Sequence, residues 1–151
     1  MQVLREVVKR PLWLWAGVVV VLLAGCGKKS SSEMSPGGAG NVTLTGAQEV
    51  PPLPTSGSGR GTITVSADRT VTGSVTATGV PGTAAHIHMA APGQNGPVII
   101  PLVKSGDNVW TVPAGAKLTD AQYEAYKAGN PYVNVHTEVN KGGEVRGQLK
   151  P

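Results

Sequence analysis

The chain of 151 residues is poor in cysteine, charge and aromatic side chains. Cys26 is its only cysteine, which excludes an internal disulfide and a Cys-x-x-Cys redox motif. Charged residues make up 15% of the chain, and the net charge is +4. Three of the 13 basic residues and one of the nine acidic residues lie within residues 1–10, so the remainder carries only +2. So small a charge excludes the basic surface that nucleic-acid binding requires.

Signatures of common enzyme classes are also missing. The sequence contains no Gly-x-Ser-x-Gly nucleophile elbow and no Gly-rich phosphate-binding loop. The carboxylates beyond residue 10 show no pairing that suggests hydrolytic chemistry. We therefore expect a binding or structural protein rather than an enzyme.

Residues 1–25 have the pattern of a signal peptide. Three basic residues lie among the first ten, and the stretch 11–27 is free of charge and rich in Leu, Trp and Val. This stretch is short for a membrane span, which needs roughly 20 apolar residues. It fits the apolar core of a signal peptide, which directs export.

The end of this segment, Leu23-Ala24-Gly25-Cys26, resembles the bacterial lipobox. The resemblance implies that the Cys26 thiol receives a diacylglycerol and that cleavage precedes it, which anchors the protein to a membrane surface. Gly27 in place of Asp resembles lipoproteins sent on to the outer membrane, so we expect an envelope protein that faces the periplasm. The alternative is an ordinary signal peptide, or an N-terminal membrane anchor, with an incidental cysteine. Residues 26–40 are rich in Ser and Gly and predict a flexible tether.

Residues 41–151 have the pattern of one small all-β domain. Short runs of Val, Ile and Thr alternate with Gly, Pro, Asn and Asp, which is typical of strands and turns. About eight strands spaced in this way predict an antiparallel sandwich or barrel. The predicted strands lie near residues 42–48, 61–66, 71–78, 84–89, 98–103, 109–112, 132–138 and 144–149.

One helix is predicted within this β pattern, at residues 120–128. Thr119 and Gln122 have the spacing of a capping box, in which each side chain bonds the other's backbone N–H. Gly129 ends the helix, and Pro131 prevents it from resuming.

The three histidines of the chain are the strongest candidates for a functional site. His86 and His88 are two residues apart on a predicted strand, so they share one face. The apolar Ala85, Ile87 and Met89 take the opposite face, which we assign to the core.

His136 follows the same rule, because Val133 and Val135 mark the core side of its strand. If the two strands are neighbours, the three imidazoles converge on a site that suits Cu(II) or Zn(II) and leaves a ligand position open. Asn134 and Glu138 share the outward face and could hydrogen-bond a ligating histidine. The alternative is a solvated strand face that carries histidines and holds no metal.

Three segments in the same order resemble the CHRD domain, named after chordin. They are the segment 44–52, the pair Ala85-His86-Ile87-His88 and 93–98, and the pair 132–137 and 142–149. The resemblance covers about residues 41–150 and implies an immunoglobulin-like β-sandwich.

That fold is distantly similar to copper/zinc superoxide dismutase, in which a His-x-His pair and a later histidine bind copper. His86, His88 and His136 match this pattern, and Arg146 loosely matches the active-site arginine of that enzyme. The chain has no fourth histidine and no cysteine pair, so it lacks the bridging histidine, the zinc ligands and the disulfide. A complete dismutase is therefore excluded, whereas a lone copper site is compatible with the sequence.

Three functions remain open, in order of preference. The first is a tethered module that contacts a protein or a glycan of the cell envelope. The second is a module that binds copper or zinc through the three histidines, and the third is a metal-dependent redox enzyme. Convergence of the three imidazoles would favour the last two functions over the first.

Overall fold

The computed structural model describes residues 39–151. The predicted signal peptide, Cys26 and most of the predicted tether lie outside the described residues. The tether was predicted to extend to residue 40, but the first strand already begins at Ala39. Among the described residues, no helix is long and apolar enough to cross a membrane.

The described part of the chain contains nine strands, one α-helix and one short 3-10 helix. The α-helix α1 spans Asp120–Lys127, and the 3-10 helix η1 spans Gly46–Gln48. The strands are β1 (Ala39–Thr45), β2 (Ser58–Val65), β3 (Val71–Thr78), β4 (Ala84–Met89), β5 (Val98–Pro101), β6 (Val103–Gly106), β7 (Val109–Thr111), β8 (Pro131–His136) and β9 (Val145–Gln148).

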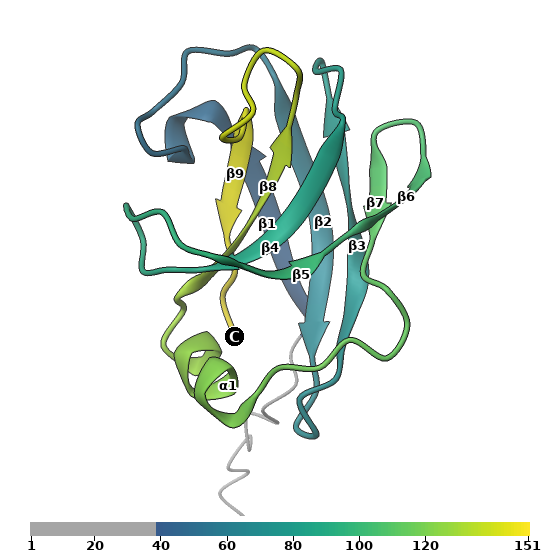
Figure 1. The fold of residues 1–151 in the computed structure, drawn as a ribbon, viewed down its shortest axis with the longest axis vertical. Helices are drawn as coiled ribbons and strands as arrows, with labels where there is room; N and C mark the ends of the chain where they lie inside the picture. The colour runs from purple at the N-terminus through teal and green to yellow at the C-terminus, as the bar shows by residue number, and fades with distance from the viewer. Residues whose placement is uncertain (1–38) are drawn as a thin grey trace, which may run out of the picture. The chain divides into compact units, whose positions relative to one another are not determined.

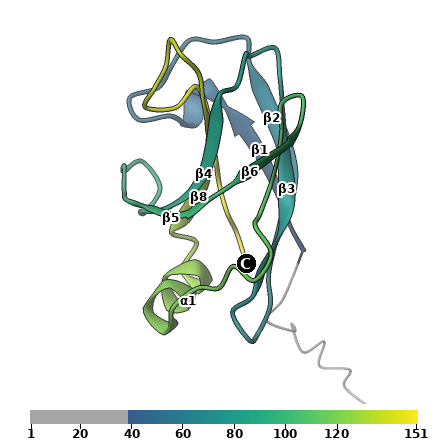
Figure 2. The same cartoon turned by 45° about the vertical axis from the view of Figure 1, so that its right-hand side comes forward.

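All nine strands belong to one antiparallel sheet with the order β5-β4-β8-β9-β1-β2-β3-β7-β6 (Figure 1). Its two edge strands, β5 and β6, are separated in sequence by Leu102 alone. The sheet therefore folds back on itself, and its two halves face each other in the turned view (Figure 2). The all-β class, the antiparallel pairing and the single short α-helix are confirmed.

Several predicted strand bounds were wrong: the strand predicted at 61–66 begins already at Ser58, and the one predicted at 132–138 ends at His136, before Glu138. Two further differences have separate reasons. The predicted strand 98–103 is two strands, because pairing changes from β4 to β7 at Leu102, whose N–H donates to the carbonyl of Ala85 at 3.0 Å. The predicted strand 42–48 ends at Thr45, and its last three residues form η1 instead. The N–H groups of Glu49 and Leu53 both donate to the carbonyl of Gly46, which turns the chain away from the sheet.

The hydrophobic core lies between the two halves of the folded sheet. Every second residue of the central strands points inward, as the pleat of a strand requires. The core cluster includes Val42 and Leu44 on β1, Ile87 on β4, and Val133 and Val135 on β8, and all five are at most 3% exposed. This apolar layer fixes which face of β4 and β8 is turned away from the core.

Helix α1 closes one end of the core. The predicted capping box is present: Thr119 Oγ1 accepts from the Gln122 N–H at 3.2 Å, and Gln122 Oε1 accepts from the Thr119 N–H at 2.9 Å. Tyr126, which is 3% exposed, belongs to the core cluster. The helix begins at Asp120 as predicted and ends at Lys127, one residue before the predicted end.

Candidate metal centre

Strands β4 and β8 are hydrogen-bonded neighbours, and their register places the three histidines on one face. His86 is opposite Asn134, and Ala84 is opposite His136. Because neighbouring strands share the direction of their pleat, His86, His88 and His136 all point away from the core. One ring nitrogen from each histidine lies within 4.8 Å of the other two. The structure thus brings together the three residues that the sequence singled out.

The outward face is covered rather than open to solvent. His88 is 8% exposed and His136 is 9% exposed, while His86 is half-buried. Two loops lie over them, residues 90–97 after β4 and residues 137–144 after β8. The sequence pattern was compatible with a solvated face, because alternation alone does not show that loops cover the polar side.

Backbone carbonyls of these two loops fix the orientation of two imidazoles. His88 Nδ1 donates to the carbonyl of Gly96 at 2.9 Å, and His136 Nδ1 donates to the carbonyl of Lys141 at 2.9 Å. A histidine that donates through Nδ1 keeps the lone pair of its Nε2 free for a metal. Nε2 is therefore the ring nitrogen through which His88 and His136 could bind a metal, and only that of His88 is without a hydrogen-bond partner among the described residues.

The third histidine presents its other nitrogen. His86 Nδ1 lies 2.9 Å from His136 Nε2, and the hydrogen-bond partners assign the proton to His86. For His86 Nδ1 to bind a metal, its proton would have to move to Nε2 of the same ring. That move would also free His136 Nε2 for the metal. The donor set is then one Nδ1, from His86, and two Nε2, from His88 and His136.

One buried ring nitrogen of the site lacks a hydrogen-bond partner in the described part of the chain, which is compatible with a metal ligand. His88 Nε2 is buried and has no hydrogen-bond partner among the described residues. Buried polar atoms are rarely left unpaired, and an ion ligated there would satisfy this one. Copper or zinc bound at about 2.0–2.1 Å keeps its nitrogen ligands within about 4 Å of one another. The largest separation, 4.8 Å, therefore closes with a side-chain shift of about 1 Å.

The electrostatics of the site favour the uncharged form of His86 and His136. Burial lowers the pKa of His86 below its ordinary value, and the neighbouring His136 and His88 lower it further. Burial also lowers the pKa of His136, against the hydrogen bond to the Lys141 carbonyl, which raises it. Neutral imidazole is the form that binds a metal, so both rings are available as ligands at neutral pH.

A cavity of about 360 Å³ opens onto the three histidines. Val98, Glu138 and Lys141 lie on its lining beside the imidazoles. Three protein ligands with access from outside leave a coordination position for an exogenous molecule. The arrangement can therefore hold an ion and expose it to a small ligand.

The other three predicted site residues take different positions. Asn134 is buried between the histidines in register, but its Nδ2 donates to the carbonyl of Gly142 at 3.1 Å rather than to an imidazole. Glu138 is exposed at the cavity. Arg146 is 1% exposed and lies over the ring of Tyr132, with 3.4 Å from its guanidinium carbon to the ring centre.

Sequence reasoning missed the groups that orient the histidines. They are the carbonyls of Gly96 and Lys141 together with Tyr132, whose ring stacks on His88 at 4.8 Å between ring centres. A backbone carbonyl leaves no mark on the residue type. The loop requires glycine at position 96, because a Cβ there would lie 1.9 Å from the carbonyl oxygen of Met89. The glycine was visible in the sequence, but the reason for it was not.

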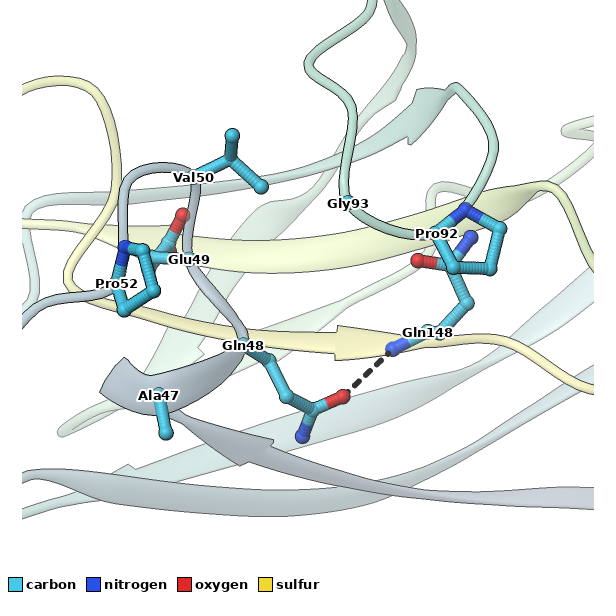
Figure 3. Close-up of a pocket in the computed structure, with 8 residues that line it drawn as sticks. All are labelled: Ala47, Gln48, Glu49, Val50, Pro52, Pro92, Gly93 and Gln148. Atoms are coloured by element: carbon cyan, nitrogen blue, oxygen red, sulfur yellow. Dashed lines mark hydrogen bonds between the residues drawn. The ribbon is translucent and has the colours of Figure 1, made fainter.

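A second pocket, of about 340 Å³, lies between the loops 46–54 and 90–97 and is also lined by Gln148 on β9 (Figure 3). Gln48 and Gln148 meet in it, where Gln48 Oε1 accepts from the Gln148 backbone N–H at 3.4 Å. A hydrogen bond connects the two loops directly, because Asn95 Nδ2 donates to the Val50 carbonyl at 2.8 Å. The hydrogen bond from Asn95 to Val50 thus restrains the loop 90–97, which also contains the Gly96 carbonyl that accepts from His88.

Comparison with known proteins identifies one family. The model of that family, described as the CHRD domain, matches residues 41–149, which is nearly all of the described chain. Neither the curated proteins nor the solved structures contain a match to this sequence.

Proposed function

The chain belongs to the CHRD domain family, and from that premise we propose that its domain is a metal-binding module of the cell envelope. The three imidazoles of His86, His88 and His136 would hold copper or zinc. The observation that carries the proposal is the convergence of three ring nitrogens within 4.8 Å, one of them buried and unpartnered. This convergence favours metal binding over a module that only contacts a protein or a glycan.

The donor set limits the choice of ion. Three neutral imidazoles without a thiolate or a carboxylate suit copper and zinc, whereas calcium and magnesium prefer oxygen ligands. The three histidines would bind the ion, the carbonyls of Gly96 and Lys141 would orient two of the imidazole rings, and the covering loops would restrict access to the ion. A bound copper would add one-electron chemistry, but nothing beyond the open coordination position favours an enzyme over a binding module.

A metal titration of the full chain tests this function. All three proteins compared carry Cys26→Ser, so that the thiol does not bind metal. The first carries no other change, the second is a triple variant with His86→Ala, His88→Ala and His136→Ala, and the third carries Glu138→Gln. We expect the first to bind one Cu(II) or Zn(II) stoichiometrically and the triple variant to bind none. A Glu138→Gln variant should bind like the first protein, because Glu138 lines the cavity but is not a hydrogen-bond partner of any of the three imidazoles. Equal, weak binding by all three proteins would contradict the proposal.

We further propose that Cys26 carries the lipid that anchors this module to a membrane facing the periplasm. The support is the lipobox-like Leu23-Ala24-Gly25-Cys26 after an apolar, charge-free stretch. Mass spectrometry of the N-terminal peptide from a bacterial membrane fraction should find a diacylglycerol on the thiol of Cys26. The Cys26→Ser variant should leave the membrane fraction, and its retention there would contradict the lipid anchor.

A further inference from the structure

A buried positive charge lies beside the candidate metal centre. Arg146 on β9 is 1% exposed, and its two hydrogen bonds go to neutral side chains, Asn95 Oδ1 and Gln148 Oε1, both at 3.3 Å. Within the described part of the chain, no carboxylate forms an ion pair with it. The guanidinium charge is therefore held out of water without a contacting counter-ion.

Tyr132 connects this charge to one of the metal ligands. Strand β8 lies between β4 and β9, so the ring of Tyr132 lies between His88 and Arg146. The guanidinium carbon is 3.4 Å from the Tyr132 ring centre, and the His88 ring stacks on Tyr132 at 4.8 Å with an interplanar angle of 7°. The Tyr132 hydroxyl also accepts from the Gly96 N–H at 3.3 Å, while the Gly96 carbonyl accepts from His88. The stack thus fixes the distance between the charge and the ligand.

We propose that Arg146, positioned by Tyr132, sets the preference of the centre for Cu(I) over Cu(II). The proposal rests on the three-histidine centre proposed above. A fixed positive charge disfavours the doubly charged ion more than the singly charged one, and burial limits the screening of that charge by solvent. One unit charge at about 10 Å, in a medium with an effective dielectric constant of about 20, changes an equilibrium constant roughly tenfold.

Glu49 provides an internal test of the sign. Its side chain is 6% exposed, its Oε1 has no hydrogen-bond partner among the described residues, and its charge interacts with that of Arg146. A negative charge at Glu49 opposes the field of Arg146. Removing the charge of Arg146 and removing the charge of Glu49 should therefore change the ratio of Cu(I) to Cu(II) affinity in opposite directions.

The experiment compares the affinities of the full chain for Cu(I) and Cu(II), each measured by competition with a chelator specific for that oxidation state. All proteins carry Cys26→Ser, and the measurements are made at pH 8, where Glu49 is ionised. We expect Arg146→Gln to lower the ratio of Cu(I) to Cu(II) affinity about tenfold. Arg146→Lys keeps the charge and should leave the ratio close to that of the parent, and Glu49→Gln should raise it.

The outcomes separate this proposal from the one on which it rests. A ratio that is unchanged in Arg146→Gln and Glu49→Gln, while both proteins still bind copper, would overturn the role of Arg146 and leave the metal centre intact. Failure of the parent protein to bind either ion would overturn the centre itself and this proposal with it. If Arg146→Gln does not fold, the shift in Glu49→Gln decides, because that change preserves the shape of the side chain.

Discussion

The two faces of strands β4 and β8 are both buried, but they are covered by different structures and serve different purposes. The inner face consists of apolar side chains such as Ile87 and Val133, which pack against the opposite half of the sheet. The outer face carries His86, His88 and His136 and is covered by loops rather than by a sheet. On the inner face shape alone must match, whereas on the outer face each polar atom needs a partner.

This difference shows where function is placed in the domain. The inner face lacks polar side chains to bind a ligand, so it specifies and stabilises the fold. On the outer face, His88 Nε2 and Asn134 Oδ1 are buried without hydrogen-bond partners among the described residues, as is Glu49 Oε1 on the loop after η1. The core residues Trp110 and Tyr126 also each leave one buried polar atom without a partner there. Such groups cost stability unless something satisfies them, and His88 Nε2 is the one that lies beside two further imidazoles, where a bound ion would satisfy it.

The largest expected effect comes from the inner face. Ile87→Ala removes a side chain that is 1% exposed and leaves a cavity between the two halves of the sheet. We expect the free energy of unfolding to fall by about 2–5 kcal/mol. Chemical denaturation with urea measures the loss. Metal affinity per folded molecule should stay unchanged, and a large drop in that affinity would show that the two faces are not independent.

His86→Ala is the matched change on the outer face, one residue away in the sequence. It removes one of three ligands, so metal affinity should fall by more than about 100-fold, the upper end of what the loss of an outer partner costs. The stability of the metal-free protein should change by less than about 1 kcal/mol, because His86 is half-buried and bonds only His136. Competition binding and urea denaturation of the same sample measure both quantities. A stability loss as large as that of Ile87→Ala would contradict the comparison.

Gly96→Ala tests the loop that covers the outer face. The added Cβ would lie 1.9 Å from the Met89 carbonyl oxygen, so the loop must move and its carbonyl must leave His88 Nδ1. We expect metal affinity to fall by about 10–100-fold. Gly142→Ala is the control, because nothing lies within 4 Å of a Cβ built there. Equal affinities of the two variants would show that the carbonyl does not orient the ligand.

The smallest expected effect concerns Glu49 and pH. Burial raises the pKa of Glu49 to about 7 from an ordinary value of 4.5, although the charge of Arg146 lowers it. The folded protein therefore binds a proton between these values that the unfolded chain releases, so this contribution to stability is lost as the pH rises from 4.5 to 7. Relative to Glu49→Gln, the wild-type chain should lose about 1–3 kcal/mol between pH 4.5 and pH 8. Parallel pH profiles of the two proteins in urea denaturation would contradict a buried carboxyl.

The sequence was sufficient to predict the all-β class, the helix and the convergence of the three histidines, but not the break at Leu102 that makes two strands of 98–103, nor η1. Alternating residues in 84–89 and 132–138 separated the apolar from the polar face, and the capping box located the helix. The residues did not show that 90–97 and 137–144 cover the polar face. The positions of the carbonyls of Gly96 and Lys141 depend on the tertiary path of those loops, which side-chain periodicity does not encode.

Arg146 shows the same limit at a single residue. From the sequence, Arg146 was a candidate only through its loose match to the active-site arginine of copper/zinc superoxide dismutase. The stack of Arg146 on Tyr132, and of Tyr132 on His88, depends on β8 lying between β4 and β9. Strand order is a property of the whole sheet, so a neighbour relation across three strands could not be read from any one segment.

Pulsed electron paramagnetic resonance of the full chain loaded with one Cu(II) tests the central claim most directly, because it counts the imidazoles bound to the ion. With Cys26→Ser in all samples, we predict three coordinated imidazoles in the parent protein, two in His86→Ala, and three in Ile87→Ala. Fewer than three imidazoles in the parent, or the same number in His86→Ala, would contradict a metal centre built on the outer face of β4 and β8.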